Sequence, residues 1–125
     1  MRVAVTGGTG FIGGYVVEAL CRAGHTPRCL VRPTSDTSRI AHRRFERAVG
    51  DVLDADAVAA LVAGCDAVIH LALSAGWDQM RTHEQLQRLL RTSGAGTENV
   101  LRAARNAGNL RVVFVSSVAV RTARR

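Results

Sequence analysis

Three glycines near the start of the chain have the spacing of a loop that binds phosphate. Gly7, Gly10 and Gly13 follow the apolar run 3–5 and precede a segment with helical periodicity. Gly7 would let the chain turn sharply where φ must be positive. Gly10 would let the backbone approach a phosphate, and Gly13 would let the helix pack closely on the strand. Because free N–H groups and the positive end of the helix dipole would face the ligand, the run predicts a dinucleotide pyrophosphate site.

The residues between these glycines belong to the same predicted site. Thr9, Phe11 and Ile12 occupy the turn and the start of the helix, where backbone N–H groups have no partner within the helix. We therefore expect all three to contact the cofactor. A glycine triplet alone is weak evidence, since any tight strand-to-helix turn can need one. Its place directly after a strand and before an amphipathic helix favours the nucleotide interpretation.

Arg32 is the candidate residue for choosing between the two nicotinamide dinucleotides. It stands at the end of the second predicted strand, 19 positions after Gly13, where NAD-preferring folds place an acid for the ribose 2′-hydroxyl. A guanidinium cannot accept that hydrogen bond, but it can pair with a 2′-phosphate. No acid lies between Arg22 and Arg32, and the next one is Asp36. The sequence therefore favours NADP over NAD, the alternative being a solvated arginine at a strand end.

Five stretches of the chain, taken in order, resemble the extended short-chain dehydrogenase/reductases, the epimerase/dehydratase and dihydroflavonol-reductase-like group. The opening TGGTGFIGG is the most specific of them. The others are 50–52 (GDV), 66–72 (DAVIHLA), 96–101 (GTENVL) and 111–117 (RVVFVSS). The resemblance implies a Rossmann-type domain that binds NAD(P), and hydride transfer between the nicotinamide and a carbonyl or secondary alcohol.

The resemblance also assigns roles to single residues. Asp51 resembles the family's contact to the adenine amine, and Val52 would cover the adenine ring. The backbone groups of Leu71 and Ala72 would lie beside the cofactor ribose. Ser117 aligns with the family's catalytic hydroxyl, which hydrogen-bonds the reacting carbonyl or hydroxyl of a small-molecule substrate.

Three further polar residues have less certain roles. His70 lies inside an apolar strand with no acidic partner in register, so we interpret it as a packed core histidine. Ser93 stands where the family usually has asparagine, which puts a water relay through this position in doubt. Asn99 belongs to the GTENVL run, and a structural bond from the helix to nearby backbone is at least as good an explanation as catalysis.

The family's general acid/base is a tyrosine followed four residues later by a lysine. Here the only tyrosine is Tyr15, it is followed at that spacing by Ala19, and the chain has no lysine. The resemblance therefore implies that residues 1–125 form a truncated dinucleotide-binding domain, incomplete at the C-terminus and without the substrate domain. We expect this chain alone to be inactive. The alternative is a non-catalytic NADP-binding sensor or partner-binding module.

Composition narrows the class of protein. All 17 basic residues are arginines, spread along the chain and interleaved with acids, so the net charge of +7 indicates arginine-rich codon usage rather than a specific nucleic-acid partner. No apolar run approaches the ~20 residues of a membrane span. The three cysteines lack metal-ligand spacing. We expect a cytoplasmic protein without a metal or membrane partner, which pairs with a second copy or with a missing C-terminal half.

The elements that must position these residues alternate between strand and helix. Strands are predicted at 2–6, 27–31, 47–49, 66–73 and 112–116. Helices are predicted at about 12–23, 54–64 and 81–107, with a loop and a short weak helix at 34–44. On the long helix, the expected inward stripe is Leu86, Leu90, Ser93, Thr97, Val100, Leu101 and Ala104. Alternating βαβ units predict an α/β fold, a doubly wound parallel sheet of five strands in the order 3-2-1-4-5.

Overall fold

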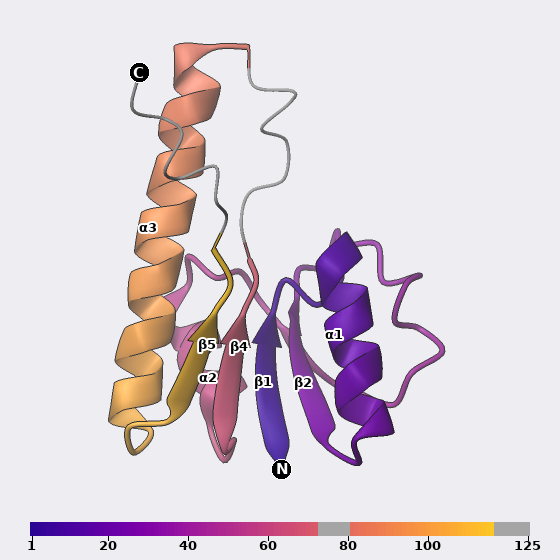
Figure 1. Ribbon diagram of the computed structural model, residues 1–125. Coiled ribbons are helices and arrows are strands. Elements are labelled where there is room, and N and C mark those ends of the chain that lie inside the picture. The colour runs from indigo at the N-terminus through magenta and orange to yellow at the C-terminus, as the bar shows by residue number, and fades with distance from the viewer. Residues whose placement is uncertain (73–80, 117–125) are drawn as a thin grey trace.

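The computed structural model describes residues 1–72 and 81–116 of the chain. Five parallel strands form one sheet in the order β3-β2-β1-β4-β5, which confirms the predicted order (Figure 1). The strands are β1 (Arg2–Thr6), β2 (Thr26–Val31), β3 (Glu46–Val49), β4 (Ala67–His70) and β5 (Arg111–Phe114). Because all five run in the same direction, their carboxyl ends meet at one edge of the sheet, where doubly wound folds bind ligands.

Helices cover both faces of the sheet and bury two apolar clusters. The helices are α1 (Phe11–Arg22), α2 (Ala55–Val62) and α3 (His83–Asn106). Val3 and Val5 of β1 pack in the cluster that includes Val17 of α1, whereas Ala4 packs with residues of α2 and α3. This alternation follows from the two-residue period of a strand. The central strand β1 is thus fixed from both sides, and the turn that follows it is held rigidly.

Two helix starts show side-chain caps. The Asp54 side chain accepts hydrogen bonds from the N–H groups of Asp56 and Ala57, which confirms the predicted cap of α2. Thr82 and Gln85 form a capping box at the start of α3. The start of α1 differs, because its N-cap is Gly10, which has no side chain to supply a cap. No helix of the described residues is both long and apolar enough to span a bilayer.

The segment between β2 and β3 forms turns, so the short helix predicted within 34–44 is wrong. Ile40 in this segment is fully buried in the cluster beneath α1. The Asp36 side chain accepts a hydrogen bond from the N–H of Ser38, a local bond that competes with helix formation. One apolar anchor and a polar turn therefore fix this segment without a helix.

The predicted inward stripe of α3 is partly wrong. Leu90 and Leu101 are more than half exposed, whereas Val100 is buried as predicted and Leu89 is buried although it was not on the stripe. The remaining buried residues of α3 are small: Gly96, Ala103 and Ala104. Small side chains let the backbone of α3 approach α2 and the sheet closely. The buried face of α3 is therefore the one with small residues and not the one with the most large apolar residues. Counting large apolar residues could not reveal this.

Candidate nucleotide-binding site

The fold itself requires glycine at two positions of the turn between β1 and α1. Gly7 has a φ of +74°, and a Cβ there would lie 2.7 Å from the carbonyl carbon of Leu71 in the neighbouring strand's extension. A Cβ on Gly13 would overlap the carbonyl oxygen of Gly7. Gly7 therefore supplies the predicted sharp turn, and Gly13 the predicted close contact between helix and strand. Neither observation alone requires a ligand.

Gly10 is different, because the protein leaves space beside it. A Cβ there would meet only the carbonyl oxygen of Gly7 at 3.3 Å, and its φ of −76° suits any residue. Within the described part of the chain, the N–H groups of Phe11 and Ile12 donate to no acceptor, and both residues are exposed. The first turn of α1 also lacks an acidic residue. Space, free donors and the positive end of the dipole together fit a phosphate group.

Arg32 directly follows β2, at the same edge of the sheet as the glycine turn. Its side chain is exposed and takes part in none of the ion pairs among the described residues. The nearest following acid, Asp36, is engaged locally: hydrogen bonds from the backbone and side chain of Ser38 lower the pKa of its carboxyl. Arg32 is thus available to an anion.

Asp51 and Val52 form a turn directly after β3 that α3 holds in place. The Asp51 Oδ1 accepts the N–H of Leu53 at 2.9 Å, so this carboxylate stabilises the turn. Val52 is buried against α3, where a Cβ on Gly96 would come within 2.9 Å of its Cγ1. The Asn99 side chain donates to the Val52 carbonyl at 3.0 Å. Asn99 therefore makes a structural bond to backbone, as considered for it, but the partner lies in another element that the sequence did not reveal.

Leu71 and Ala72 extend β4 past the glycine turn, as predicted. The side-chain oxygen of Thr6 accepts the N–H groups of both residues at 3.2 Å. The close approach of Gly7 to the same backbone shows that the ends of β1 and β4 meet here. The structure thus gathers the residues of the glycine turn, Arg32, the 51–52 turn and 71–72 at the carboxyl edge of the sheet.

His70 is 1% exposed, so its predicted position in the core is confirmed. Its Nδ1 lies 2.6 Å from the Thr6 hydroxyl and its Nε2 lies 3.0 Å from the Thr97 hydroxyl. The ring also stacks on Phe114, with 5.5 Å between ring centroids. Burial lowers the pKa of His70 from its ordinary value. These two hydroxyl partners come from distant segments of the chain, so the sequence around His70 does not reveal them.

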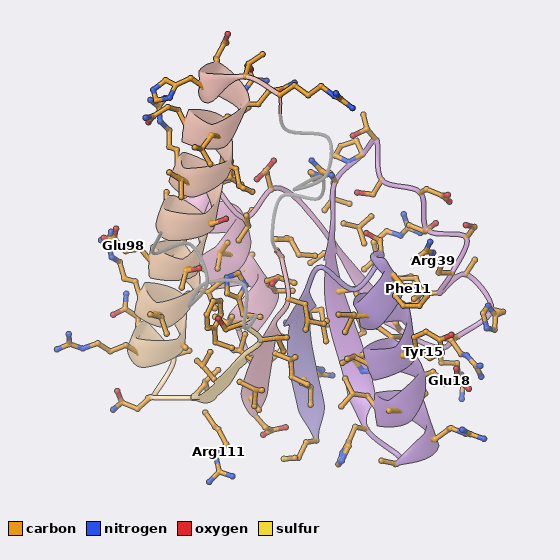
Figure 2. The ribbon with its side chains drawn as sticks, turned by 45° about the horizontal axis from the view of Figure 1, so that its top comes forward. Phe11, Tyr15, Glu18, Arg39, Glu98 and Arg111 are labelled. Atoms are coloured by element: carbon orange, nitrogen blue, oxygen red, sulfur yellow. The ribbon has the colours of Figure 1, made fainter. Side chains whose placement is uncertain are left out.

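Tyr15 lies outside this site, and one further candidate group is not among the described residues. Tyr15 is exposed on α1, where its ring packs edge-on against the ring of Phe11. The Arg39 guanidinium lies over the Phe11 ring (Figure 2). This environment is a surface cluster, so Tyr15 does not replace the family's catalytic tyrosine at the strand ends. Ser117, the predicted catalytic hydroxyl, lies outside the described residues.

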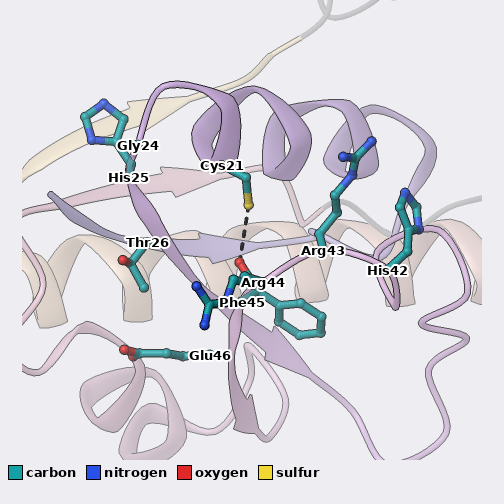
Figure 3. A pocket seen from close by; sticks show the side chains of 9 residues that line it. All are labelled: Cys21, Gly24, His25, Thr26, His42, Arg43, Arg44, Phe45 and Glu46. Carbon is teal, nitrogen blue, oxygen red and sulfur yellow. Dashed lines mark hydrogen bonds between the residues drawn. The ribbon is translucent and has the colours of Figure 1, made fainter.

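A separate cleft of about 660 Å³ lies at the opposite end of the sheet (Figure 3). The end of α1 and the starts of β2 and β3 form it, with Cys21, His25, His42 and Arg44 among its lining residues. The Cys21 thiol donates to the Arg44 carbonyl at 3.2 Å. Because the cleft is at the amino ends of the strands, it is not the predicted cofactor site.

The described residues hold no cluster of three His, Cys, Asp or Glu side chains that could bind a metal ion. Burial, with a smaller effect of Cys21, raises the pKa of the Cys29 thiol to about 12. Cys29 is therefore an inert core residue at neutral pH. The chemistry available at the carboxyl edge of the sheet is anion binding and hydrogen bonding.

A parallel sheet of this order, with a glycine turn leading from β1 into α1, defines a Rossmann-type dinucleotide-binding domain. The model of the NAD dependent epimerase/dehydratase family matches residues 3–122. The chain therefore belongs to the NAD-dependent epimerase/dehydratase family, as the resemblance implied.

Individual relatives agree with this assignment. The chain is 40% identical over 121 residues to a 3 beta-hydroxysteroid dehydrogenase/Delta 5-->4-isomerase of Mycobacterium tuberculosis, a match covering 95% of this chain and 32% of the relative. It is 35% identical over 122 residues to cinnamoyl-CoA reductase 1 of Oryza sativa subsp. japonica, covering 92% and 34%. The crystal structure of UDP-glucose 4-epimerase from Brucella ovis in complex with NAD superposes with a TM-score of 0.82 at 30% identity, covering 94% and 36%. The chain thus spans about a third of the length of the curated relatives it matches.

Proposed function

We propose that this chain is the NADP-binding part of an oxidoreductase or epimerase/dehydratase. When bound, the nicotinamide would exchange a hydride with a carbonyl or secondary alcohol of a small-molecule substrate. The observation that carries the proposal is the space beside Gly10 together with the free N–H groups of Phe11 and Ile12. A glycine with only the Gly7 oxygen near its Cβ position, at the start of a helix without a side-chain cap, is explained by a phosphate ligand.

The other residues at this edge would bind and orient the remaining parts of the dinucleotide. Arg32 would hold the 2′-phosphate with its planar guanidinium. Asp51 would accept a hydrogen bond from the adenine amine through the carboxylate, while Val52 would cover the ring. The backbone of Leu71 and Ala72, which extends β4, would lie beside the ribose. In the substrate site, Ser117 would orient the reacting group by a hydrogen bond.

The preference for NADP can be tested with one charge reversal. We expect NADPH to bind at least several-fold more tightly than NADH, and Arg32→Glu to reverse this order, because a carboxylate repels the 2′-phosphate and accepts from a 2′-hydroxyl. Calorimetric titration of both cofactors measures the two affinities. Arg44→Glu is the matched control, since it makes the same change of charge at the opposite end of the sheet. Equal affinities of the parent for the two cofactors would contradict the assignment.

The second candidate function is NADP binding without catalysis, as in a sensor or a partner-binding module. The observation in its favour is that the only tyrosine, Tyr15, is 63% exposed in a surface cluster and the chain has no lysine. Both functions predict that this chain alone binds NADPH without turnover, so the two separate in the coding sequence that follows residue 125. A tyrosine followed four residues later by a lysine there supports the enzyme, whereas a continuation without that pair supports the module.

A further inference from the structure

The hydrogen bonds around His70 determine where its proton lies. The Thr6 hydroxyl oxygen accepts the N–H of Ala72 at 3.2 Å, and it shares the N–H of Leu71, also at 3.2 Å, with the Thr6 carbonyl oxygen at 3.0 Å. Its own hydroxyl proton is therefore left to be donated, and the Nδ1 of His70 at 2.6 Å is in position to accept it. An Nδ1–H would instead place a third donor on the same oxygen. The Nδ1 must carry no proton.

The other ring nitrogen is fixed by α3. The Thr97 hydroxyl donates to the carbonyl of Ser93, one helical turn earlier, at 2.6 Å. Its oxygen can then only accept from the ring, and the Nε2 of His70 lies 3.0 Å away. The Nε2 must carry the proton, so the ring is neutral and held in one tautomer. Its two hydrogen bonds connect β1, β4 and α3.

From this network we infer that His70 is a positioning residue for nucleotide binding, which fixes the backbone at the glycine turn by linking Thr6 to Thr97 through its neutral Nε2–H tautomer. The inference rests on the proposed function, because it concerns the same site. Thr6 immediately precedes Gly7, and its oxygen also holds the extension of β4 past the cofactor. A change at Thr97 on α3 would therefore reach the turn through His70.

Protonation of His70 would break the link. A proton on Nδ1 would force the Thr6 hydroxyl to turn away, and the oxygen would face three donors. Among the described residues, the groups facing the ring are Thr6 from β1, Thr97 from α3 and Phe114 from β5, none of them charged. Burial is accordingly the one cause that lowers the pKa of His70.

The sign of the pH effect follows from this lowered pKa. Below the ordinary value of 6.5 the unfolded chain takes up the proton first. Stability is therefore full above that pH and falls as the pH drops toward the lower pKa of the folded state. Nucleotide affinity should fall only as the pH reaches the lowered pKa of the folded state, because the ring stays neutral and holds the turn above it.

The tautomer is tested directly by nitrogen NMR of the labelled imidazole ring. We expect at pH 7 a protonated Nε2 and a bare Nδ1, with a hydrogen-bonded Nε2–H that exchanges slowly with water. A ring protonated at Nδ1, a charged ring, or fast exchange between the two tautomers would overturn the inference. This readout does not depend on any ligand.

The positioning role is tested by titration with NADP⁺ at pH 8. Thr97→Val keeps the shape but removes the acceptor for Nε2–H, and we expect it to bind roughly tenfold more weakly, equivalent to about 1.4 kcal/mol. Thr97→Ser keeps the hydroxyl and should bind like the parent. If the parent binds and Thr97→Val binds equally well, only the positioning role is wrong. If the parent does not bind NADP⁺, the proposed function is wrong and the positioning role falls with it.

The pH dependence needs one further control, because a 2′-phosphate itself titrates near pH 6. His70→Gln offers polar groups of similar reach but has no charge to gain. We expect its affinity at pH 8 to lie between those of the parent and Thr97→Val. As the pH is lowered from 8 to the lowest value at which both proteins stay folded, the parent should lose more affinity than His70→Gln, and parallel pH profiles of the two proteins would contradict the account.

Discussion

Replacing Gly13 by alanine is expected to cost at least about 3 kcal/mol of the free energy of unfolding, at the upper end of the range for overpacking. The added Cβ would overlap the carbonyl oxygen of Gly7, and a Cβ also lies too close to the Cα of Gly8 at 2.7 Å. Both are backbone atoms, which cannot move aside as a side chain could. Urea denaturation followed by circular dichroism measures the change.

The matched control is the next residue along α1. A Cβ on Gly14 would meet the Cβ of Arg39 at 3.5 Å, an ordinary van der Waals contact. Gly14→Ala should therefore leave stability unchanged or raise it by up to about 1 kcal/mol, because alanine favours the helix. If the two alanine variants were equally stable, the close packing of α1 on the turn would be wrong.

Replacing Gly10 by valine is expected to abolish nucleotide binding while the protein stays folded. Its φ of −76° suits valine, and only the Gly7 oxygen lies near the new Cβ. The branched side chain would instead fill the space we assign to the pyrophosphate. We expect the dissociation constant of NADPH to rise at least about a hundredfold, or about 2.7 kcal/mol, as measured by calorimetry.

Two comparisons make the Gly10 result specific. Gly14→Ala should bind NADPH like the parent, since the N–H of Gly14 already donates to the Gly10 carbonyl and its Cβ would face Arg39. Circular dichroism of Gly10→Val should match that of the parent. A Gly10→Val protein that binds like the parent would mean that the glycine turn is merely structural.

Much of the fold could be predicted because its signals are local. The glycines that end the helices, the Asp54 cap and the apolar runs of the strands each act within a few residues. The strand order then follows from general rules for parallel sheets. The segment 34–44 failed because one buried residue, Ile40, fixes it through a contact that sequence periodicity cannot reveal.

The part of the candidate site that could be predicted from sequence is the glycine turn, because few residues other than glycine can occupy such positions. Gly7 and Gly13 are required by backbone contacts, whereas a Cβ on Gly10 would meet only the Gly7 oxygen, at 3.3 Å. The partners of His70 and Asn99 lie 27 to 64 residues away in the sequence, so their pairing appears only in the fold. His70 in particular has hydroxyl partners, whereas a search for catalytic pairs looks for carboxylates.

The most direct test of the central claim is an amide NMR titration of the protein with NADP⁺. The account predicts saturable chemical-shift changes at Gly7, Gly10 and the N–H groups of Phe11 and Ile12, together with a change at Arg32. The basic cleft at the other end of the sheet, which His42 and Arg44 line, should show none. Shifts confined to that cleft, or no saturable shifts at the glycine turn, would contradict the account.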